Sequence, residues 1–216
     1  MNSSISPARA GARRVRAAVI AVAAAALLTA CGGQDLTGSE AAPGQGVPAA
    51  TAGAGTTATG ETVAALDRSV PQRVTIPSLG VSSTLETLGQ NADGAMTTPK
   101  DPDLAGWYEP GPTPGSQGPA VIAGHVTWNG ADAVFKKLKT MKAGDTVEVQ
   151  REDGRTVTFT VERVEEYEKA KFPTLEVYKN VDHAGLRLVT CGGEFDADRH
   201  YYPNNVVVFA TMTAVA

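Results

Sequence analysis

Residues 146–164 read TVEVQREDGRTVTFTVERV, and this stretch decides the kind of fold. Apolar and polar residues alternate along 146–151 and again along 156–164, which is the period-two pattern of half-buried β-strands. The residues between these runs include Asp153-Gly154, and Asp-Gly is a strong signal for the tight turn of a β-hairpin. The stretch therefore predicts two antiparallel strands.

Further short runs with β-type sequence lie on both sides of this hairpin. They are residues 73–77, 81–88, 118–126, 186–191 and 206–211. By contrast, residues 131–141 place apolar side chains at helical spacing with lysines opposite, which predicts a short helix. Seven or eight short strands with one or two short helices predict a mostly β domain that closes, or nearly closes, into a barrel.

The overall composition argues against a nucleic-acid-binding protein. The chain has 216 residues, a formal net charge of −4 and only 6% aromatic residues. Nucleic-acid binders show basic patches with aromatic platforms, and neither is visible here. The length favours one domain, with room for a tail.

Residues 1–31 have the pattern of an export signal. Basic residues (Arg9, Arg13, Arg14 and Arg16) precede an apolar run over 17–28, and Leu28-Thr29-Ala30-Cys31 then resembles a bacterial lipobox, in which the cysteine is lipidated. The alternatives are a retained membrane anchor and an ordinary signal peptide with a chance Cys31; the arginine pair is a weak twin-arginine signal. Each alternative places the folded domain on the extracytoplasmic face of the membrane.

Residues 32–69 are rich in Gly, Ala, Thr and Pro and nearly free of large apolar side chains. Such a segment cannot bury enough surface to offset the entropy of ordering, so we expect a flexible tether. The folded domain is expected to cover residues 70–216.

Cys191 is one of only two cysteines in the chain. Exported proteins generally use cysteines in disulfides, but a lipidated Cys31 would carry a thioether and could not pair. Cys191 would then be an unpaired thiol, which is a candidate reactive group.

Three residues from separate segments could form a thiol-dependent active site: His125, Cys191 and Arg199. A thiolate needs a nearby positive charge to exist near neutral pH, and a histidine can supply that charge and then protonate a leaving amine. An arginine can stabilise a carbonyl oxygen as it becomes an oxyanion. A structural interpretation is also open for each residue: a small buried thiol, a satisfied histidine and a solvated arginine.

The segments around these residues carry a family resemblance. They are Ala123-Gly124-His125, Leu188-Val189-Thr190-Cys191, Asp198-Arg199-His200-Tyr201 and Asn205-Val206-Val207-Val208-Phe209-Ala210. This pattern resembles the sortases, the membrane-anchored cysteine transpeptidases of Gram-positive bacteria, from about Val70 to the C-terminus. Arg187 stands where the family motif has its first threonine. Cys-Gly-Gly and Asn-Val-Val-Val suggest the actinobacterial class F group rather than the pilus-building class C.

The resemblance implies a role for each matching residue. Cys191 would attack the Thr–Gly carbonyl of an LPXTG-type sorting signal, His125 would act as general acid and then base, and Arg199 would contact the substrate carbonyl. Thr190 would help shape the oxyanion pocket. The connection 169–183 would carry the substrate groove, lined by Phe172, Pro173, Leu175 and Val177, with core packing as the alternative for these four.

The partners implied are LPXTG-bearing surface proteins or peptides, an amine of the cell-wall precursor, and the membrane through the N-terminal segment. We expect a monomer with no cofactor. We also expect no metal, because the histidines and carboxylates form no ligand cluster in the sequence. Two alternative functions stay open: a cysteine endopeptidase that releases its product to water, and a non-catalytic surface-binding lipoprotein. An L,D-transpeptidase is disfavoured, since His125 and Cys191 lie 66 positions apart (191 − 125).

Overall fold

The predicted hairpin is present as β7 (Thr146–Arg151) and β8 (Thr156–Glu168), paired antiparallel from Thr146 opposite Thr160 to Gln150 opposite Thr156. The structure is a computed structural model that describes residues 63–216. Gly154 in the turn has a φ of 83°, a left-handed conformation that glycine adopts without strain. The alternating pattern of the sequence thus becomes the first pair of a larger sheet.

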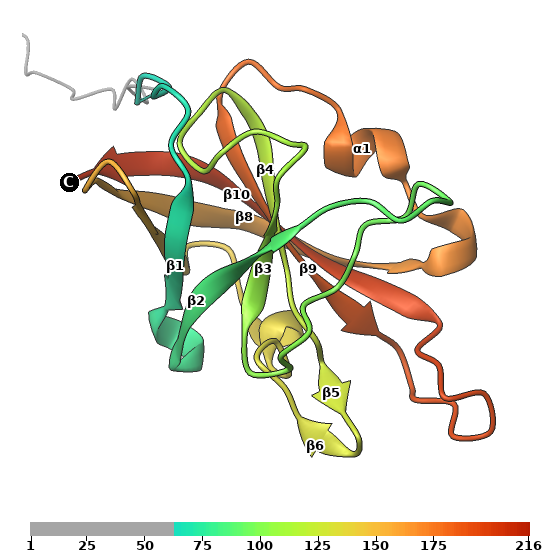
Figure 1. Cartoon of the computed structure of the whole chain (residues 1–216). Helices are drawn as coiled ribbons and strands as arrows, with labels where there is room; N and C mark the ends of the chain where they lie inside the picture. Colours follow the sequence, from blue (N-terminus) through green and yellow to red (C-terminus); the bar gives the residue numbers. More distant parts are fainter. Residues whose placement is uncertain (1–62) are drawn as a thin grey trace, which may run out of the picture. The chain divides into compact units, whose positions relative to one another are not determined.

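Eight strands close into one barrel in the order β1-β2-β3-β4-β9-β10-β8-β7 (Figure 1). Besides β7 and β8, the strands are β1 (Pro71–Ile76), β2 (Val81–Leu88), β3 (Ala105–Tyr108), β4 (Gly118–Ala123), β9 (Ala184–Gly192) and β10 (Asn204–Val215). Most neighbours are antiparallel, but β2–β3 and β4–β9 are parallel. The mostly β, barrel-shaped fold expected from the sequence is confirmed.

The remaining elements are short. A two-stranded hairpin of β5 (Thr127–Trp128) and β6 (Ala131–Asp132) projects from the barrel (Figure 1). The helical elements are η1 (Pro77–Leu79), η2 (Leu138–Thr140), η3 (Lys169–Lys171) and α1 (Thr174–Tyr178). Two of them, η3 and α1, lie in the connection between β8 and β9.

Apolar side chains pack on both faces of the sheet. The barrel interior contains fully buried residues from most strands, such as Val74, Ile122, Phe159 and Leu186. On the opposite face of β4, β9 and β10 lies a second cluster, which we call the outer-face cluster. Its members are Leu88, Val121, Ala123, Val177, Val189, Val207 and Phe209. Because α1 contributes the buried Val177, this helix covers the outer face of these strands.

The helix expected over residues 131–141 is wrong. Within this segment the structure has β6 and the single 3-10 turn η2. The backbone N–H groups of Ala133, Val134 and Phe135 donate to the carbonyls of Val126, Pro102 and His125, at 3.2, 3.0 and 2.9 Å. These amides are therefore satisfied by neighbouring loops, and the apolar spacing reflects burial of Phe135 and Leu138 in turns.

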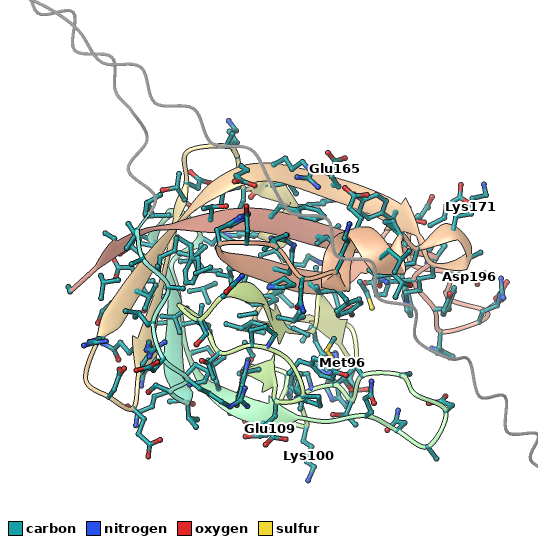
Figure 2. All side chains as sticks on the ribbon, turned by 90° about the horizontal axis from the view of Figure 1, so that it is seen from above. Met96, Lys100, Glu109, Glu165, Lys171 and Asp196 are labelled. Carbon is teal, nitrogen blue, oxygen red and sulfur yellow. The ribbon has the colours of Figure 1, made fainter. Side chains whose placement is uncertain are left out.

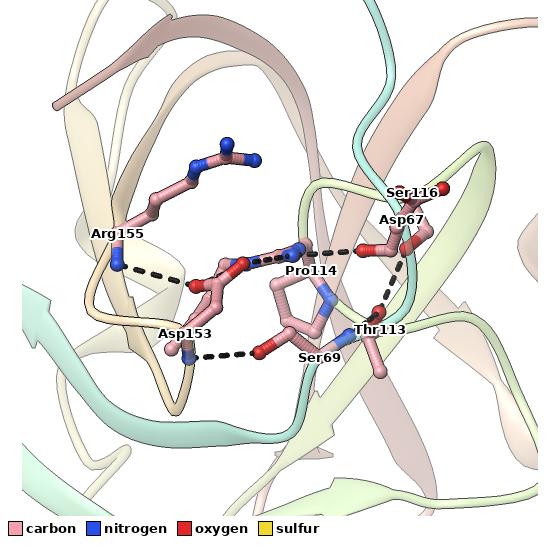
Figure 3. Close-up of polar contacts among 8 residues, drawn as sticks. Asp67, Ser69, Thr113, Pro114, Ser116, Asp153 and Arg155 are labelled. Atoms are coloured by element: carbon pink, nitrogen blue, oxygen red, sulfur yellow. Dashed lines mark hydrogen bonds and ion pairs between the residues drawn. The ribbon is translucent and has the colours of Figure 1, made fainter.

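A buried arginine fastens the segment before β1 to the barrel. This residue is Arg151, which is 2% exposed. Its guanidinium donates to the carbonyls of Pro114 at 2.6 Å and Asp67 at 2.8 Å, and it pairs with the Asp153 carboxylate at 2.8 Å. The backbone N–H of Asp153 donates to the Ser69 hydroxyl oxygen, and the Asp153 carboxylate accepts a hydrogen bond from the Arg155 N–H (Figure 3). We call this group the Arg151 clip.

Several expectations lie outside the described residues. The export signal over 1–31, Cys31 and the tether up to residue 62 belong to this part of the chain. No helix within residues 63–216 has the length and apolar character needed to cross a membrane.

Candidate active site

Cys191 lies next to the C-terminal end of β9, on the outer face of the sheet. Leu186 and Leu188 point into the barrel interior, whereas Val189 belongs to the outer-face cluster, so alternation places Cys191 on the same side as Val189. Opposite Cys191 on β10 lies Asn205. The thiol is free and half-buried, so it is open to a reagent while still sheltered by neighbours.

His125 follows β4, which is the parallel neighbour of β9. Its Nε2 lies 2.8 Å from the Pro99 carbonyl oxygen, and its ring is 4.9 Å from the ring of Trp128. Because a carbonyl oxygen can only accept, Nε2 must carry the proton in this hydrogen bond. Nδ1 is thus the nitrogen available for proton exchange.

The ends of β4 and β9 are tied together next to both residues. Thr190 Oγ1 donates to the Gly124 carbonyl at 2.7 Å, and the Gly124 N–H donates to the Val189 carbonyl at 3.1 Å. A Cβ on Gly124 would lie only 2.7 Å from side-chain atoms of Phe135 and Val134. The glycine therefore lets Phe135 pack under the turn that presents His125.

Cys191 and His125 line one cleft of about 630 Å³ on the outer face. Its wall is formed by the β2–β3 loop, Tyr108, the end of β4, η3 with α1, and the end of β9. The lining residues are Gln90, Gly94, Ala95, Met96, Thr98, Pro99, Tyr108, Ala123, Gly124, His125, Lys169, Phe172, Thr174, Tyr178, Val189, Thr190, Cys191 and Asn205. The lining is largely apolar, and Lys169, Thr190 and Asn205 are polar lining residues next to the thiol.

A second, smaller hollow of about 210 Å³ meets the cleft at Thr190 and Cys191. It is bordered by the β9–β10 loop and by the turns before η2. Lys136, Lys139, Phe195 and Tyr202 are among its lining residues. The thiol consequently faces two hollows, one on each side.

Arg199 does not line either hollow. It lies exposed in the β9–β10 loop, and its backbone N–H donates to the Asp196 carboxylate at 3.0 Å. Its guanidinium carbon is 5.5 Å from the centre of the Tyr201 ring. The sequence-predicted Cys191 and His125 are thus brought together, while Arg199 remains at the outer rim.

The four residues expected to line a substrate groove fall into different environments. Phe172 lines the cleft and packs edge-on against Tyr167. Val177 is fully buried in the outer-face cluster, Leu175 is 80% exposed, and Pro173 is half-buried outside the cleft lining. Of the four, Phe172 alone lies at the cleft; Val177 packs in the core, as the alternative interpretation had it.

Arg187 replaces the family threonine, and its side chain is buried on the outer face of β9. It is 6% exposed, and its guanidinium lies 4.7 Å from the ring of Phe209. Burial lowers the pKa of this guanidinium, and its Nε has no hydrogen-bond partner among the described residues. Arg187 is separated from Cys191 along the strand and lines neither hollow.

Two residues near the site were missed by the sequence analysis. Lys169 Nζ lies 3.6 Å from Cys191 Sγ, and the Glu86 carboxylate accepts hydrogen bonds from the backbone N–H groups of Lys100 and Asp101. These bonds lower the pKa of Glu86. Glu86 thereby holds the loop next to Pro99, the partner of His125. No short motif marks either residue, because both depend on strand register and loop closure.

The other two histidines lie elsewhere. His183 pairs with Asp182 at 3.0 Å, and His200 packs its ring 6.3 Å from that of Phe195. Neither lines the cleft. Within residues 63–216, no three His, Cys, Asp or Glu side chains are grouped so that they could hold a metal ion.

Comparison with known families identifies the class of protein. The model of the sortase domain matches residues 74–213 of this chain. This range includes His125, Cys191 and Arg199, and the chain therefore belongs to the sortase family. Members of this family are generally cysteine transpeptidases. The sequence has no match among curated proteins.

Solved structures agree on the fold. A pilus-related sortase C of group B Streptococcus has a TM-score of 0.52 at 17% identity, covering 69% of each chain. A lid mutant of sortase A from Corynebacterium diphtheriae gives 0.52 at 17% identity, covering 69% of this chain and 73% of that one. Sortase C-1 from Streptococcus pneumoniae gives 0.51 at 20% identity, with 66% of each chain covered. At these identities the likeness concerns the fold alone.

Proposed function

We propose that this sortase cleaves an LPXTG-type sorting signal between Thr and Gly and transfers the acyl product to a cell-wall amine. The observation that carries the proposal is the free, half-buried thiol of Cys191 in one cleft with His125. A cleft with an apolar wall and a few polar groups near a nucleophile suits an extended peptide with apolar side chains.

The first half-reaction would form a thioester. The Cys191 sulfur bonds to the carbonyl carbon of the scissile peptide, and the carbonyl electron pair moves onto oxygen. When the C–N bond breaks, the leaving amine takes a proton from His125, whose Nδ1 is not engaged by Pro99. Arg199 would approach the developing oxyanion from the β9–β10 loop. Its ring partner Tyr201 also contacts Lys169, which lines the cleft.

The second half-reaction would release the product. An incoming amine attacks the thioester carbonyl, His125 accepts the amine proton, and the S–C bond breaks to return the Cys191 thiolate. The smaller hollow on the other side of the thiol supports this step, because an amine can approach there while the acyl chain occupies the cleft. Class F membership is proposed on the Cys191-Gly192-Gly193 and Asn205-Val206-Val207-Val208 sequences.

The decisive experiment incubates the full chain with an LPXTG peptide, with and without hydroxylamine. We expect cleavage between Thr and Gly and a hydroxamate product that forms only when hydroxylamine is present. A product made solely with water in the presence of a primary amine would favour the endopeptidase alternative. Cleavage that persists in Cys191→Ala would contradict the thioester mechanism.

We also propose that the protein acts at the extracytoplasmic face of the membrane, held there by a lipidated Cys31. The support is the sequence of residues 1–31, with its basic and apolar runs and its lipobox-like end. Cell fractionation of Cys31→Ala is expected to release the protein from the membrane fraction while peptide cleavage continues. Equal membrane retention of the variant and the unaltered chain would instead support a retained anchor.

A further inference from the structure

One positive charge lies in direct contact with the thiol, and it belongs to Lys169. The Nζ atom donates a hydrogen bond to Cys191 Sγ over 3.6 Å, a distance suited to sulfur. Among residues 63–216 no other side chain is hydrogen-bonded to this sulfur. Lys169 lines the same cleft as Cys191 and His125.

Strand register brings Lys169 to this position. Glu168, the last residue of β8, lies opposite Asn204 of β10, and Asn204 lies opposite Gly192 of β9. The Lys169 N–H then donates to the Pro203 carbonyl at 2.9 Å. The ends of β8 and β9 and the start of β10 thus lie together, and Lys169 begins η3 beside the end of β9.

The Lys169 ammonium contacts an aromatic ring but forms no ion pair within the described residues. Its Nζ lies 4.4 Å from the centre of the Tyr201 ring, within the range of a cation–π contact. In the described part of the chain no carboxylate is within 4.0 Å of Nζ, whereas nearby Lys171 pairs with Glu168 at 2.9 Å. The charge of Lys169 is therefore available to the sulfur.

We propose that Lys169 is a catalytic residue that holds Cys191 as a thiolate, leaving His125 to transfer protons. A lysine beside a cysteine favours the thiolate, which is the nucleophilic form. His125 is less suited to this task, because its Nε2 is bonded to the Pro99 carbonyl and neither of its nitrogens is hydrogen-bonded to Sγ in the described structure. The inference rests on the proposed function in one respect only, the use of Cys191 as nucleophile.

Other charges surround the thiol at greater range. The titratable and charged side chains that line the two hollows or lie beside Gly192 are Tyr108, His125, Lys136, Lys139, Glu166, Lys169, Tyr178 and Tyr202. Lys136 pairs with Asp132 at 2.9 Å, and Glu166 accepts from Asn204 at 2.8 Å. Since Lys169 alone among these groups is hydrogen-bonded to Sγ in the described structure, removing its charge should have the largest effect on the thiol.

The test measures alkylation of Cys191 by iodoacetamide, a reaction of the thiolate that needs no peptide substrate. All variants are made in the full chain carrying Cys31→Ala, so that Cys191 is the only thiol. The variants are Lys169→Met, Lys169→Arg and the matched control Lys171→Met. Lys171 lies two positions further on, points away from the barrel (Figure 2) and does not line the cleft.

At pH 7 we expect Lys169→Met to be alkylated about tenfold more slowly than the parent, from loss of a unit charge near the sulfur. Lys169→Arg should stay within about threefold of the parent, since its charge is kept. The gap between Lys169→Met and the parent should close near pH 9.5, where a thiol ionises without help. Lys171→Met should match the parent at both pH values.

Two results would overturn the proposal. One is an unchanged alkylation rate in Lys169→Met at pH 7. The other is a loss of equal size at both pH values, which would indicate a distorted site rather than a missing charge. Because no sorting peptide is used, failure of this test is distinct from failure of the proposed function, which is decided by peptide cleavage.

Discussion

The Arg151 clip and the polar side chains of the Cys191 cleft lie on the same barrel, but they differ in how many of their donors and acceptors are hydrogen-bonded. Arg151 donates to two carbonyls and one carboxylate, and every one of these contacts lies within the protein. In the cleft, the thiol has one donor neighbour, and Nδ1 of His125 is not hydrogen-bonded within the described residues.

This difference distinguishes a cluster that stabilises the fold from one that is suited to a reaction. A buried polar cluster that satisfies all its members fixes the fold, because breaking it leaves unpaired buried groups. A cluster with spare donors and acceptors costs stability and is kept where a substrate completes it. The comparison assigns the Arg151 clip to holding the barrel together and the cleft to the reaction.

The largest expected effect is on the cleft side of this comparison. Cys191→Ala should lower peptide cleavage by at least about 10⁴-fold, since it removes the nucleophile. Its free energy of unfolding should change by less than about 1 kcal/mol, because the side chain is small and half-buried. Peptide cleavage and urea unfolding of the same preparation measure both. A large loss of stability would mean that Cys191 is a packing residue.

Arg151→Met should show the opposite behaviour. It leaves the carbonyls of Pro114 and Asp67 without their donor and should reduce the free energy of unfolding by about 3 kcal/mol. Cleavage per folded molecule should remain near normal, because the clip lies away from the cleft lining. The control is Arg155→Met, whose side chain makes no hydrogen bond or ion pair in the described structure. Equal destabilisation by both changes would break the comparison.

Arg199→Lys tests whether the rim arginine joins the reaction. We expect a loss of about 100-fold in kcat/KM, because a single ammonium cannot reproduce the fork of guanidinium donors at an oxyanion. Stability should not change, since the side chain is exposed. Near-normal turnover would reduce Arg199 to a surface charge and leave Lys169 as the principal cation of the site.

The smallest effect is expected from the support behind His125. Glu86→Gln replaces an acceptor of two backbone N–H groups with an amide that opposes one of them, and should lower kcat by about fivefold. Because folding lowers the pKa of Glu86, the contribution of this carboxylate to the free energy of unfolding is present above the ordinary carboxyl pKa. It is lost as the pH falls through the lowered value. In Glu86→Gln this acid-dependent loss should be absent. Glu109→Gln, at an exposed position after β3, is the control. Its free energy of unfolding should depend on pH as that of the parent does.

Strands with clear alternation were predictable from sequence, and their extent was close to that observed. Residues 146–151 form β7 with the same bounds. The strand β3 was missed because it has only four residues, and one of them is Gly106, a residue type that is uncommon in strands. Glycine is needed there because a Cβ would collide with Leu88. The helix over 131–141 was wrong because the N–H groups of Ala133, Val134 and Phe135 donate to carbonyls outside this segment, and apolar spacing does not reveal such partners.

Cys191 and His125, the proposed nucleophile and base, could be singled out from the sequence because each lies in its own short segment that resembles the family. Lys169 could not, since its proximity to Cys191 depends on the combined register of β8, β10 and β9 over 22 residues of separation. The burial of Val177 likewise depends on which side of α1 faces the sheet, a feature that five helical residues are too few to reveal by periodicity.

The most direct test of the account is the mass of the intact chain after brief incubation with an LPXTG peptide. We predict an adduct equal to the acyl part of the peptide, located on Cys191 and removed by hydroxylamine, and its absence in Cys191→Ala. Peptide cleavage without any adduct on Cys191, or an adduct on another residue, would contradict the central claim that this thiol is the nucleophile.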